Sequence, residues 1–349
     1  MPTMLPRDRI FAAVNFQATD VLPCIILEAP GGFYDHGQKL LDLMRVCGSD
    51  FSNLDLAKVP PGPPASDFGS DGKYHAIKTD EWGITWEYRI FGVWGHPIRW
   101  PLADITQLDA YRLPPVPATS GPEFDAACAR GRQQRERYFQ LANVTGMFER
   151  MSDLRPFEET LMDIAEDTPE INRLADRLTE RAHEEVRYAL ALGADAISVC
   201  DDFGTRSACF FSPQRFREFF KPRYQAIFAP VKKAGKKVFF HSCGQVWDIL
   251  EDLRDIGVDA IWPQLPVYDL AALARRCWEL RIAVQLHPDR GDLMQNGPAA
   301  QVREYVLRLL ETFRTMEGGS FLHIEIDPNF KWENVEMLLK VATELRRGG

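Results

Sequence analysis

The chain has 349 residues, of which 45% are hydrophobic and 26% charged, and a net charge of −9. This composition is typical of a soluble globular protein, and the acidic excess argues against a nucleic-acid partner bound through its phosphates. No apolar run approaches the roughly 20 residues that cross a bilayer. The N-terminus lacks the apolar core of a secretory signal, and seven scattered cysteines do not suggest disulfides. We therefore expect a cytoplasmic protein without membrane segments.

The first part of the chain predicts strand and helix in alternation. Helical spacing predicts a short helix over residues 6–16, and the apolar run 21–28 predicts a buried strand that ends in a carboxylate, Glu28. A helix over 36–47 and a short strand over 50–55 follow.

Residues 58–120 differ from their surroundings, because they are rich in Pro and Gly and hold four of the eight tryptophans. Residues 80–91 alternate like a strand, 92–95 supply a turn, and 96–100 return as a second strand. We interpret this segment as an insertion, a hairpin or lid, within a single domain that covers residues 1–349. Its tryptophans either pack the insertion against the body or contact a substrate.

From residue 138 onward strands and helices alternate regularly. Strands are predicted over 138–145, 195–200, 237–243, 258–264, 281–287 and 320–327, and helices over 156–165, 168–192, 212–235, 246–256, 269–280, 298–316 and 332–346. With the two earlier strands this makes eight, most of them followed by a helix. The pattern predicts an α/β protein, a (β/α)8 TIM barrel with the insertion after its second strand. An open, doubly wound sheet is the alternative, although nucleotide-binding signatures are absent.

Polar and ionisable side chains stand where the predicted strands end. They are Glu28, Asp55, Glu149, Asp201, Asp202, His241, Cys243, Gln264, His287, Asp289, His323, Glu325 and Asp327. Because barrel enzymes carry their chemistry at the carboxyl ends of the strands, we predict a functional pocket there.

The strongest metal signal is His241 and Cys243. Side chains at i and i+2 of a strand point to the same side, so an imidazole and a thiol are presented together, as in zinc sites. His323 and Glu325 share a face of the last strand by the same rule, and we expect Glu325 to complete the site, with His323 as the alternative. His287 is either a further candidate or a rim histidine bonded to backbone.

The acidic pair Asp201 and Asp202 ends the strand 195–200. One of the two carboxylates either orients the substrate or acts as an acid–base group whose pKa its neighbour shifts. The alternative is a helix cap together with an ion pair to Arg206.

Five runs, taken together and in this order, resemble the uroporphyrinogen decarboxylase superfamily. They are DDFGT (201–205), SPQRFREFFKP (212–222), VFFHSCG (238–244), GVDAI (257–261) and EN (333–334). The chain is most similar to the corrinoid-dependent methyltransferase branch, which includes methylcobamide:coenzyme M methyltransferases and O-demethylase methyltransferases. The resemblance implies a (β/α)8 barrel.

The chain departs from the superfamily pattern at two places. Residues 23–33 hold no arginine where decarboxylases bind the carboxylates of their substrate, and Glu28 would repel a polyanionic tetrapyrrole. The methyltransferase branch uses a His-x-Cys pair, matched by His241 and Cys243, and a late Cys, which is absent from His323–Asp327. The harder ligands there favour an oxygen-bound methyl donor over a thiol acceptor such as coenzyme M.

The resemblance leads to a zinc-dependent methyltransferase that moves a methyl group from a small methylated substrate, an aryl methyl ether, to cobalamin. No D-x-H-x-x-G motif is present, so we expect a separate corrinoid protein to carry the cobalamin. The expected site has Zn²⁺ on His241, Cys243 and Glu325, catalytic Asp201, Asp202 and Glu149, and substrate-binding Glu28, Gln264, His287 and His323. The alternatives are a metal-independent lyase acting on a small carboxylated substrate and a non-catalytic binding subunit.

Overall fold

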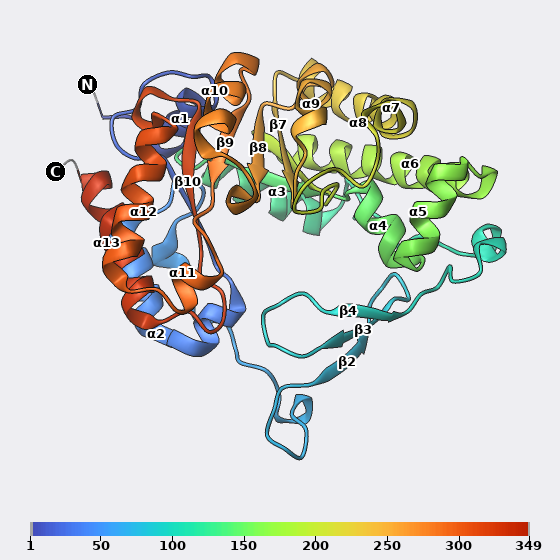
Figure 1. Cartoon of the computed structure of the whole chain (residues 1–349), viewed down its shortest axis with the longest axis horizontal. Coiled ribbons are helices and arrows are strands. Elements are labelled where there is room, and N and C mark those ends of the chain that lie inside the picture. Colours follow the sequence, from blue (N-terminus) through green and yellow to red (C-terminus); the bar gives the residue numbers. More distant parts are fainter. Residues whose placement is uncertain (1–2, 348–349) are drawn as a thin grey trace.

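The fold, known from a computed structural model that describes residues 3–347, is built on seven parallel strands with helices outside them (Figure 1). The strands are β1 (Cys24–Leu27), β5 (Leu141–Val144), β6 (Ala196–Cys200), β7 (Lys237–Ser242), β8 (Ala260–Pro263), β9 (Ala283–Leu286) and β10 (Ser320–Glu325). Their order in the sheet is β1-β10-β9-β8-β7-β6-β5. The sheet is curled, and the architecture is that of a TIM-like barrel in an α/β protein.

Helices follow most strands, as the sequence predicts. They are α1 (Pro6–Val14), α2 (Pro30–Cys47), α3 (Pro122–Arg135), α4 (Met147–Leu154), α5 (Phe157–Glu166), α6 (Pro169–Leu192), α7 (Pro213–Arg215), α8 (Lys221–Lys233), α9 (Leu250–Asp255), α10 (Leu270–Leu280), α11 (Asp292–Gln295), α12 (Ala299–Thr312) and α13 (Trp332–Arg347). A π-helical turn over Phe216–Phe220 joins α7 to α8. Between residues 3 and 347 no helix has both the length and the apolar character needed to cross a membrane.

The inside of the barrel is apolar at the amino ends of the strands. Alternate residues of each strand point inward. Near or just before the amino ends, these inward positions hold the apolar side chains Ile25, Phe139, Ala196, Phe239, Ala260, Ala283 and Phe321. Ile10 and Val14 of α1 pack into the same cluster. Because this apolar plug fills one half of the barrel, polar side chains are confined to the carboxyl half.

The predicted strand over residues 50–55 is wrong. Residues 50–52 form a bend and Leu54–Leu56 a 3₁₀ turn. The reason is local: Ser49 Oγ accepts a hydrogen bond from the Phe51 amide (3.2 Å), and Asn53 Oδ1 accepts one from the Asp55 amide (3.1 Å). Such side chains offer the backbone partners that compete with strand pairing.

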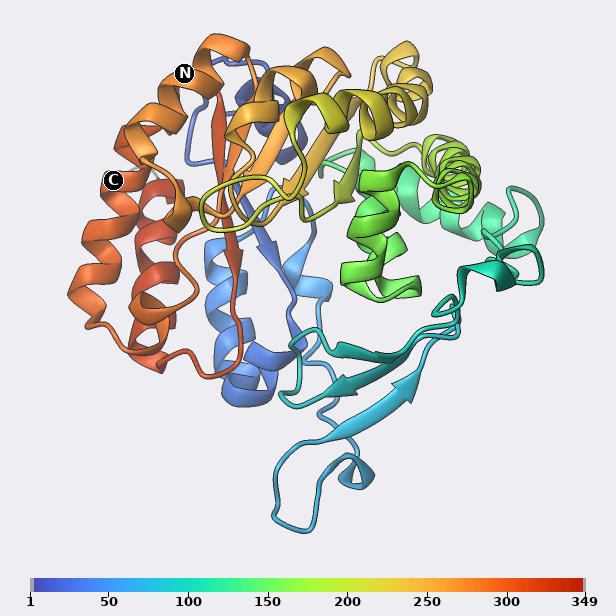
Figure 2. The same ribbon diagram turned by 45° about the vertical axis from the view of Figure 1, so that its right-hand side comes forward.

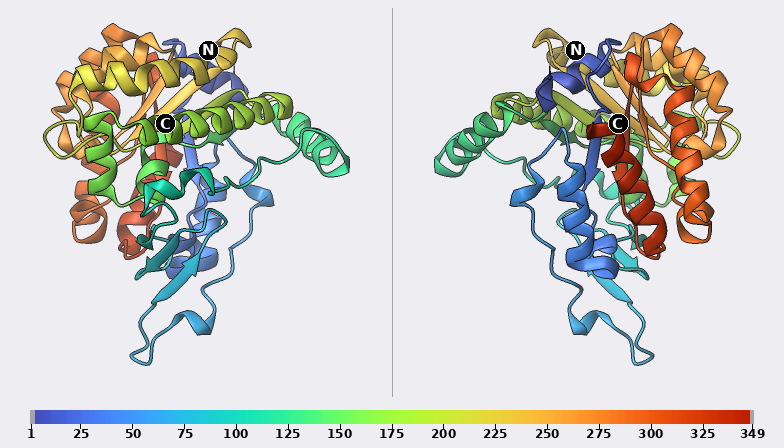
Figure 3. Two further views of the ribbon diagram at one scale, coloured as in Figure 1. Left: turned by 90° about the vertical axis from the view of Figure 1, so that its right-hand side faces the viewer. Right: turned by 90° about the vertical axis from the view of Figure 1, so that its left-hand side faces the viewer.

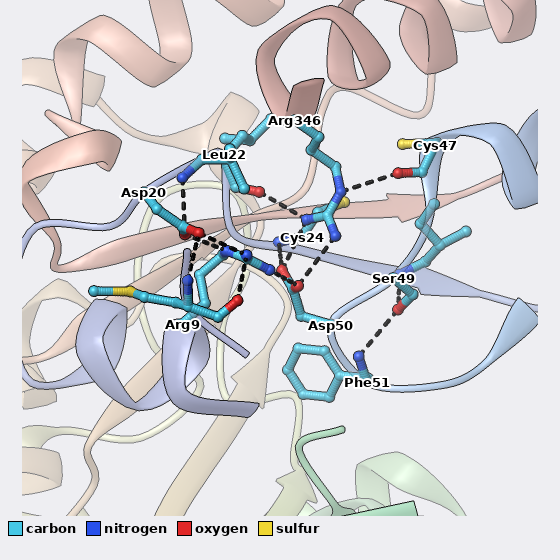
Figure 4. Close-up of polar contacts among 12 residues, drawn as sticks. Arg9, Asp20, Leu22, Cys24, Cys47, Ser49, Asp50, Phe51 and Arg346 are labelled. Atoms are coloured by element: carbon cyan, nitrogen blue, oxygen red, sulfur yellow. Dashed lines mark hydrogen bonds and ion pairs between the residues drawn. The ribbon is translucent and has the colours of Figure 1, made fainter. Parts of the chain in front are cut away.

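Asp50 spans the gap between β1 and the chain that leads into β5. Its amide donates to the Cys24 carbonyl (2.9 Å), and its own carbonyl accepts from the Phe139 amide (3.0 Å). Its buried carboxylate accepts from Arg9 Nη1 (2.5 Å), from the Cys24 amide (2.8 Å) and from both terminal nitrogens of Arg346 (2.8 and 3.0 Å), as Figure 4 shows. One residue therefore ties β1, α1, α13 and the chain before β5 together.

A second sheet lies outside the barrel. β2 (Ala76–Thr79), β3 (Thr85–Tyr88) and β4 (His96–Arg99) are antiparallel, and they project from the end of the barrel at which α2 begins (Figure 2). Gly92, at φ +81°, approaches α2 so closely that a β-carbon on it would lie 2.3 Å from the Gly31 nitrogen. On the other side, the guanidinium of Arg150 on α4 lies 4.2 Å from the ring centre of Trp82.

The tryptophans of this segment differ in exposure. Trp82 and Trp86 are buried, as expected for packing, whereas Trp94 is 72% exposed between β3 and β4. That residues 58–120 are an insertion within a single domain stays a prediction. In Figure 3 the loop that leads into β2 and the helix α3 are the two parts that extend furthest from the barrel.

Removing the charge of Asp50 tests whether this residue holds the barrel closed. Asp50→Asn removes the buried counter-charge of Arg346 and one of the two carboxylates that pair with Arg9, the other being Asp20. We therefore expect a loss of about 3–5 kcal/mol in the free energy of unfolding, measured with urea. The control is Glu344→Gln, which breaks the exposed pair with Arg303 (2.8 Å) and should cost about 1 kcal/mol or less. Equal losses in the two variants would contradict this role.

Candidate functional site

His241 and Cys243 lie together at the carboxyl end of β7, with Asp202 beside them. The distance between Cys243 Sγ and His241 Nε2 is 3.5 Å, and Asp202 Oδ1 is 3.5 Å from the same nitrogen. The Cys243 amide also donates to Asp202 Oδ1 (2.6 Å). One nitrogen, one sulfur and one carboxylate oxygen thus all lie within 4.8 Å of one another.

The protonation of His241 follows from its surroundings. Its Nδ1 is 2.8 Å from the Trp262 carbonyl, which only accepts, so Nδ1 carries the proton and the Nε2 lone pair faces Cys243 and Asp202. Burial lowers the pKa of His241 despite the nearby Asp202, so the ring stays neutral. Burial and Asp202 raise the pKa of the Cys243 thiol to about 12.

This donor set fits a zinc ion. Nitrogen, sulfur and carboxylate oxygen are zinc's usual protein ligands, and a backbone carbonyl behind the imidazole is the usual outer partner of a metal-bound histidine. Three protein donors would leave a fourth position for a substrate atom, as in catalytic zinc sites.

A cavity of about 260 Å³ opens beside these residues. It is lined by His241, Cys243, Trp262, Pro263, Gln264, Leu265, Pro266, His287, Pro288, Asp289 and Arg290. Gln264 Oε1 accepts from the Gly244 amide (2.9 Å), so this side chain also fixes the turn after β7. Trp262 and Arg290 were not predicted from the sequence. Trp262 stands two residues before Gln264, and side chains at i and i+2 of a strand point to the same side. This spacing could have predicted that Trp262 faces the site.

The structure places Glu325 in a different group from His241 and Cys243. Glu325, His287 and His323 offer ligand atoms that lie within 4.8 Å of one another. The reason is the strand order, because β8 and β9 separate β7 from β10 in the sheet. His287 lines the cavity, whereas His323 is fully buried beneath it.

Asp201 is fully buried and caps α4. Its carboxylate accepts from the Phe148 amide (2.9 Å), the Glu149 amide (2.6 Å) and the Tyr224 hydroxyl. Burial, opposed by the Tyr224 hydrogen bond, raises the pKa of Asp201 to about 7. Of the two interpretations of the acidic pair, this geometry favours the cap for Asp201 and leaves Asp202 to the group with His241.

Glu149 stands on the first turn of α4, held there by Asp201. Burial, together with the charges of Asp202 and Asp201, raises the pKa of Glu149 to about 9. The carboxyl group therefore carries a proton at neutral pH. Glu28, predicted to bind substrate, is exposed between β1 and α2 and contributes nothing to the lining of this cavity.

The chain matches one known sequence family, and its structure is similar to several solved structures. Residues 93–345 match the sequence model of the family described as uroporphyrinogen decarboxylase (URO-D). The structure is similar to a methyltransferase from Methanosarcina mazei, with 16% identity, a TM-score of 0.65 and coverage of 98% of this chain and 99% of that chain. It is also similar to a B12-independent methionine synthase from a Shewanella species (11% identity, 90% and 87% coverage, TM-score 0.47). No curated protein sequence matches the chain. The first likeness shows a shared fold, and the second is too distant to carry an argument.

The proton on Glu149 has a consequence for stability. Because its pKa is raised in the folded state, its contribution to stability is fully present below about pH 4.5 and is lost as the pH rises towards about 9. Glu149→Gln keeps the shape without the charge, so the metal-free variant should unfold at higher urea concentration than wild type at pH 8.5, and the difference should shrink at pH 5. A difference that is the same at both pH values would contradict the raised pKa.

Proposed function

The chain belongs to the uroporphyrinogen decarboxylase family, and from this premise we propose that it is a zinc-dependent methyltransferase. It moves a methyl group from a small methylated substrate, an aryl methyl ether, to cobalamin held by a separate corrinoid protein. The observation that carries the proposal is the convergence of His241 Nε2, Cys243 Sγ and an Asp202 oxygen beside a 260 Å³ cavity.

The zinc ion would be held by His241, Cys243 and a carboxylate. Asp202 is the carboxylate that the geometry favours, because it already lies 3.5 Å from His241 Nε2. The role of Glu325 as third ligand, expected from the sequence, stays a prediction. When bound, zinc supplies a Lewis acid that polarises the ether oxygen and stabilises the leaving phenolate.

The residues around the cavity suit a flat aromatic substrate. The indole of Trp262 lines it, with its ring centre 4.2 Å from that of His241, and offers an apolar face to an aromatic ring. Gln264 and His287 line the same space and orient the substrate. A tetrapyrrole with many carboxylates is disfavoured as the substrate, because the lining of the cavity offers a single arginine, Arg290, and not a cluster of them.

The reaction balances with one proton. In the proposed reaction the methyl group would pass to the electron pair of cob(I)alamin, the acceptor on the partner protein, and the phenolate would keep the electrons of the broken methyl–oxygen bond. Glu149, protonated at neutral pH, is the group that neutralises the product to a phenol, and water then returns the proton. Asp201 holds Glu149 in place through the cap of α4.

Metal analysis tests the binding part of the proposal. We expect about one zinc ion bound through Cys243 per chain, lost in His241→Ala and in Cys243→Ala and weakened in Asp202→Asn. The matched controls are His183→Ala on α6 and Cys128→Ala on α3, which remove the same residue types far along the chain from this site and should keep the ion. A zinc content in His241→Ala and in Cys243→Ala that equals the zinc content of wild type would exclude this site.

Methyl transfer tests the function itself. Wild-type protein with its zinc should convert cob(I)alamin to methylcobalamin, followed by absorbance, when offered an aryl methyl ether. His241→Ala and Cys243→Ala should reduce the rate to that without enzyme, whereas the two controls should not. If no methyl ether, thiol or amine is a donor, the methyltransferase is excluded. Full activity of metal-free protein on a small carboxylated substrate would instead establish the alternative, a metal-independent lyase.

A further inference from the structure

His287 and His323 present two buried imidazole nitrogens without partners. The Nε2 atoms of both rings are shielded from solvent, and neither has a hydrogen-bond partner among the described residues. His287 is 6% exposed and His323 is fully buried. A buried polar atom left without a partner costs about 1–3 kcal/mol, so two of them side by side require an explanation.

The two rings and a carboxylate converge on one place. The rings are stacked, with their centres 4.3 Å apart and their planes 4° from parallel. Glu325 follows His323 at i+2 on β10, and its carboxylate completes a group whose ligand atoms lie within 4.8 Å of one another. Two imidazoles and one carboxylate form the donor set that divalent zinc and non-haem iron use in proteins.

The neighbouring strand supplies the outer support that a metal-bound histidine requires. The amide of Gln285 on β9 contacts His323 Nδ1. With its nitrogen facing the ring, as in this structure, the amide favours a proton on Nε2. A half-turn of the amide presents its oxygen instead, which accepts Nδ1–H and frees the Nε2 lone pair. The turn exchanges two atoms of similar size, so the buried site can adopt the ligating form without repacking.

This group is separate from that of His241 and Cys243. The indole of Trp262 stands between them, with its ring centre 4.2 Å from that of His241 and 4.3 Å from that of His323. The nearest cation, Arg290, lies 3.7 Å from Glu325 but is held by Asp327 through its Nε (2.5 Å). Asp327 therefore offsets the charge of Arg290, which would otherwise oppose a second cation.

We propose that His287, His323 and Glu325 form a second metal site, distinct from the His241–Cys243 site, for a divalent first-row transition metal ion. His287 is the member of this group that lines the cavity, whereas His323 is fully buried and Glu325 does not reach the cavity lining. The inference assigns Glu325 to this second site and leaves Asp202 as the carboxylate beside His241 and Cys243, so it does not depend on methyl transfer.

Cobalt titration of the metal-free full chain tests the proposal, since Co²⁺ reports its own ligands. Wild type should bind about two Co²⁺ ions. One should show the sulfur-to-cobalt charge-transfer absorption that only a cysteine ligand gives, and the other should show ligand-field bands alone. The double variant His241→Ala/Cys243→Ala should keep only the ion without the sulfur band.

Variants of the second group provide the matched comparison. Glu325→Gln keeps the shape and removes the charge, so it should weaken the sulfur-free ion about tenfold or more and leave the sulfur band intact. His287→Ala in the double variant should abolish cobalt binding, and circular dichroism verifies that both variants fold. The proposal is overturned if the double variant binds no Co²⁺, or if its binding is unchanged by Glu325→Gln. Because the readout is metal content, failure of methyl transfer does not affect this outcome.

Discussion

The buried carboxylate of Asp50 is the contact on which the closure of the barrel depends. Seven strands leave a gap between β1 and β5, and no eighth strand from residues 3–347 fills it. Asp50 crosses that gap with two backbone hydrogen bonds, while Arg9 and Arg346 neutralise its charge from the first and last helices. An unpaired carboxylate at this depth would be prohibitively costly, so the N- and C-terminal helices are required for the barrel to close.

The pleat of the strands then divides the inside of the barrel into two halves. Inward positions near the amino ends carry aromatic rings and alanines, whereas those near the carboxyl ends carry His241, Trp262, Gln285 and His323. The apolar half excludes water from below. Burial consequently keeps the imidazoles neutral, because it lowers the pKa values of His241, His287 and His323. Neutral rings are the form that binds metal.

Much of this arrangement could be predicted from the sequence, because each strand from residue 138 onward is a short apolar run followed by an amphipathic helix. The period of two also pairs His241 with Cys243 and His323 with Glu325. This alternation does not reveal the order of the strands in the sheet. The separation of Glu325 from Cys243 by β8 and β9 could therefore not be predicted. The predicted strand at residues 50–55 is wrong because side chains there bond the local backbone. The helix α3 was not predicted, because it has no buried residue and therefore no apolar stripe in its sequence.

The position of β8 in the sheet has a mechanical consequence. β8 is the central strand of the seven, with three on either side, so Trp262 lies diametrically across from the gap that Asp50 bridges. A wall of this kind is most compliant at its seam and stiffest opposite it, where every strand is hydrogen-bonded on both edges. The barrel can therefore absorb distortion at the gap, while Trp262 on the central strand keeps its position between the two groups of histidines.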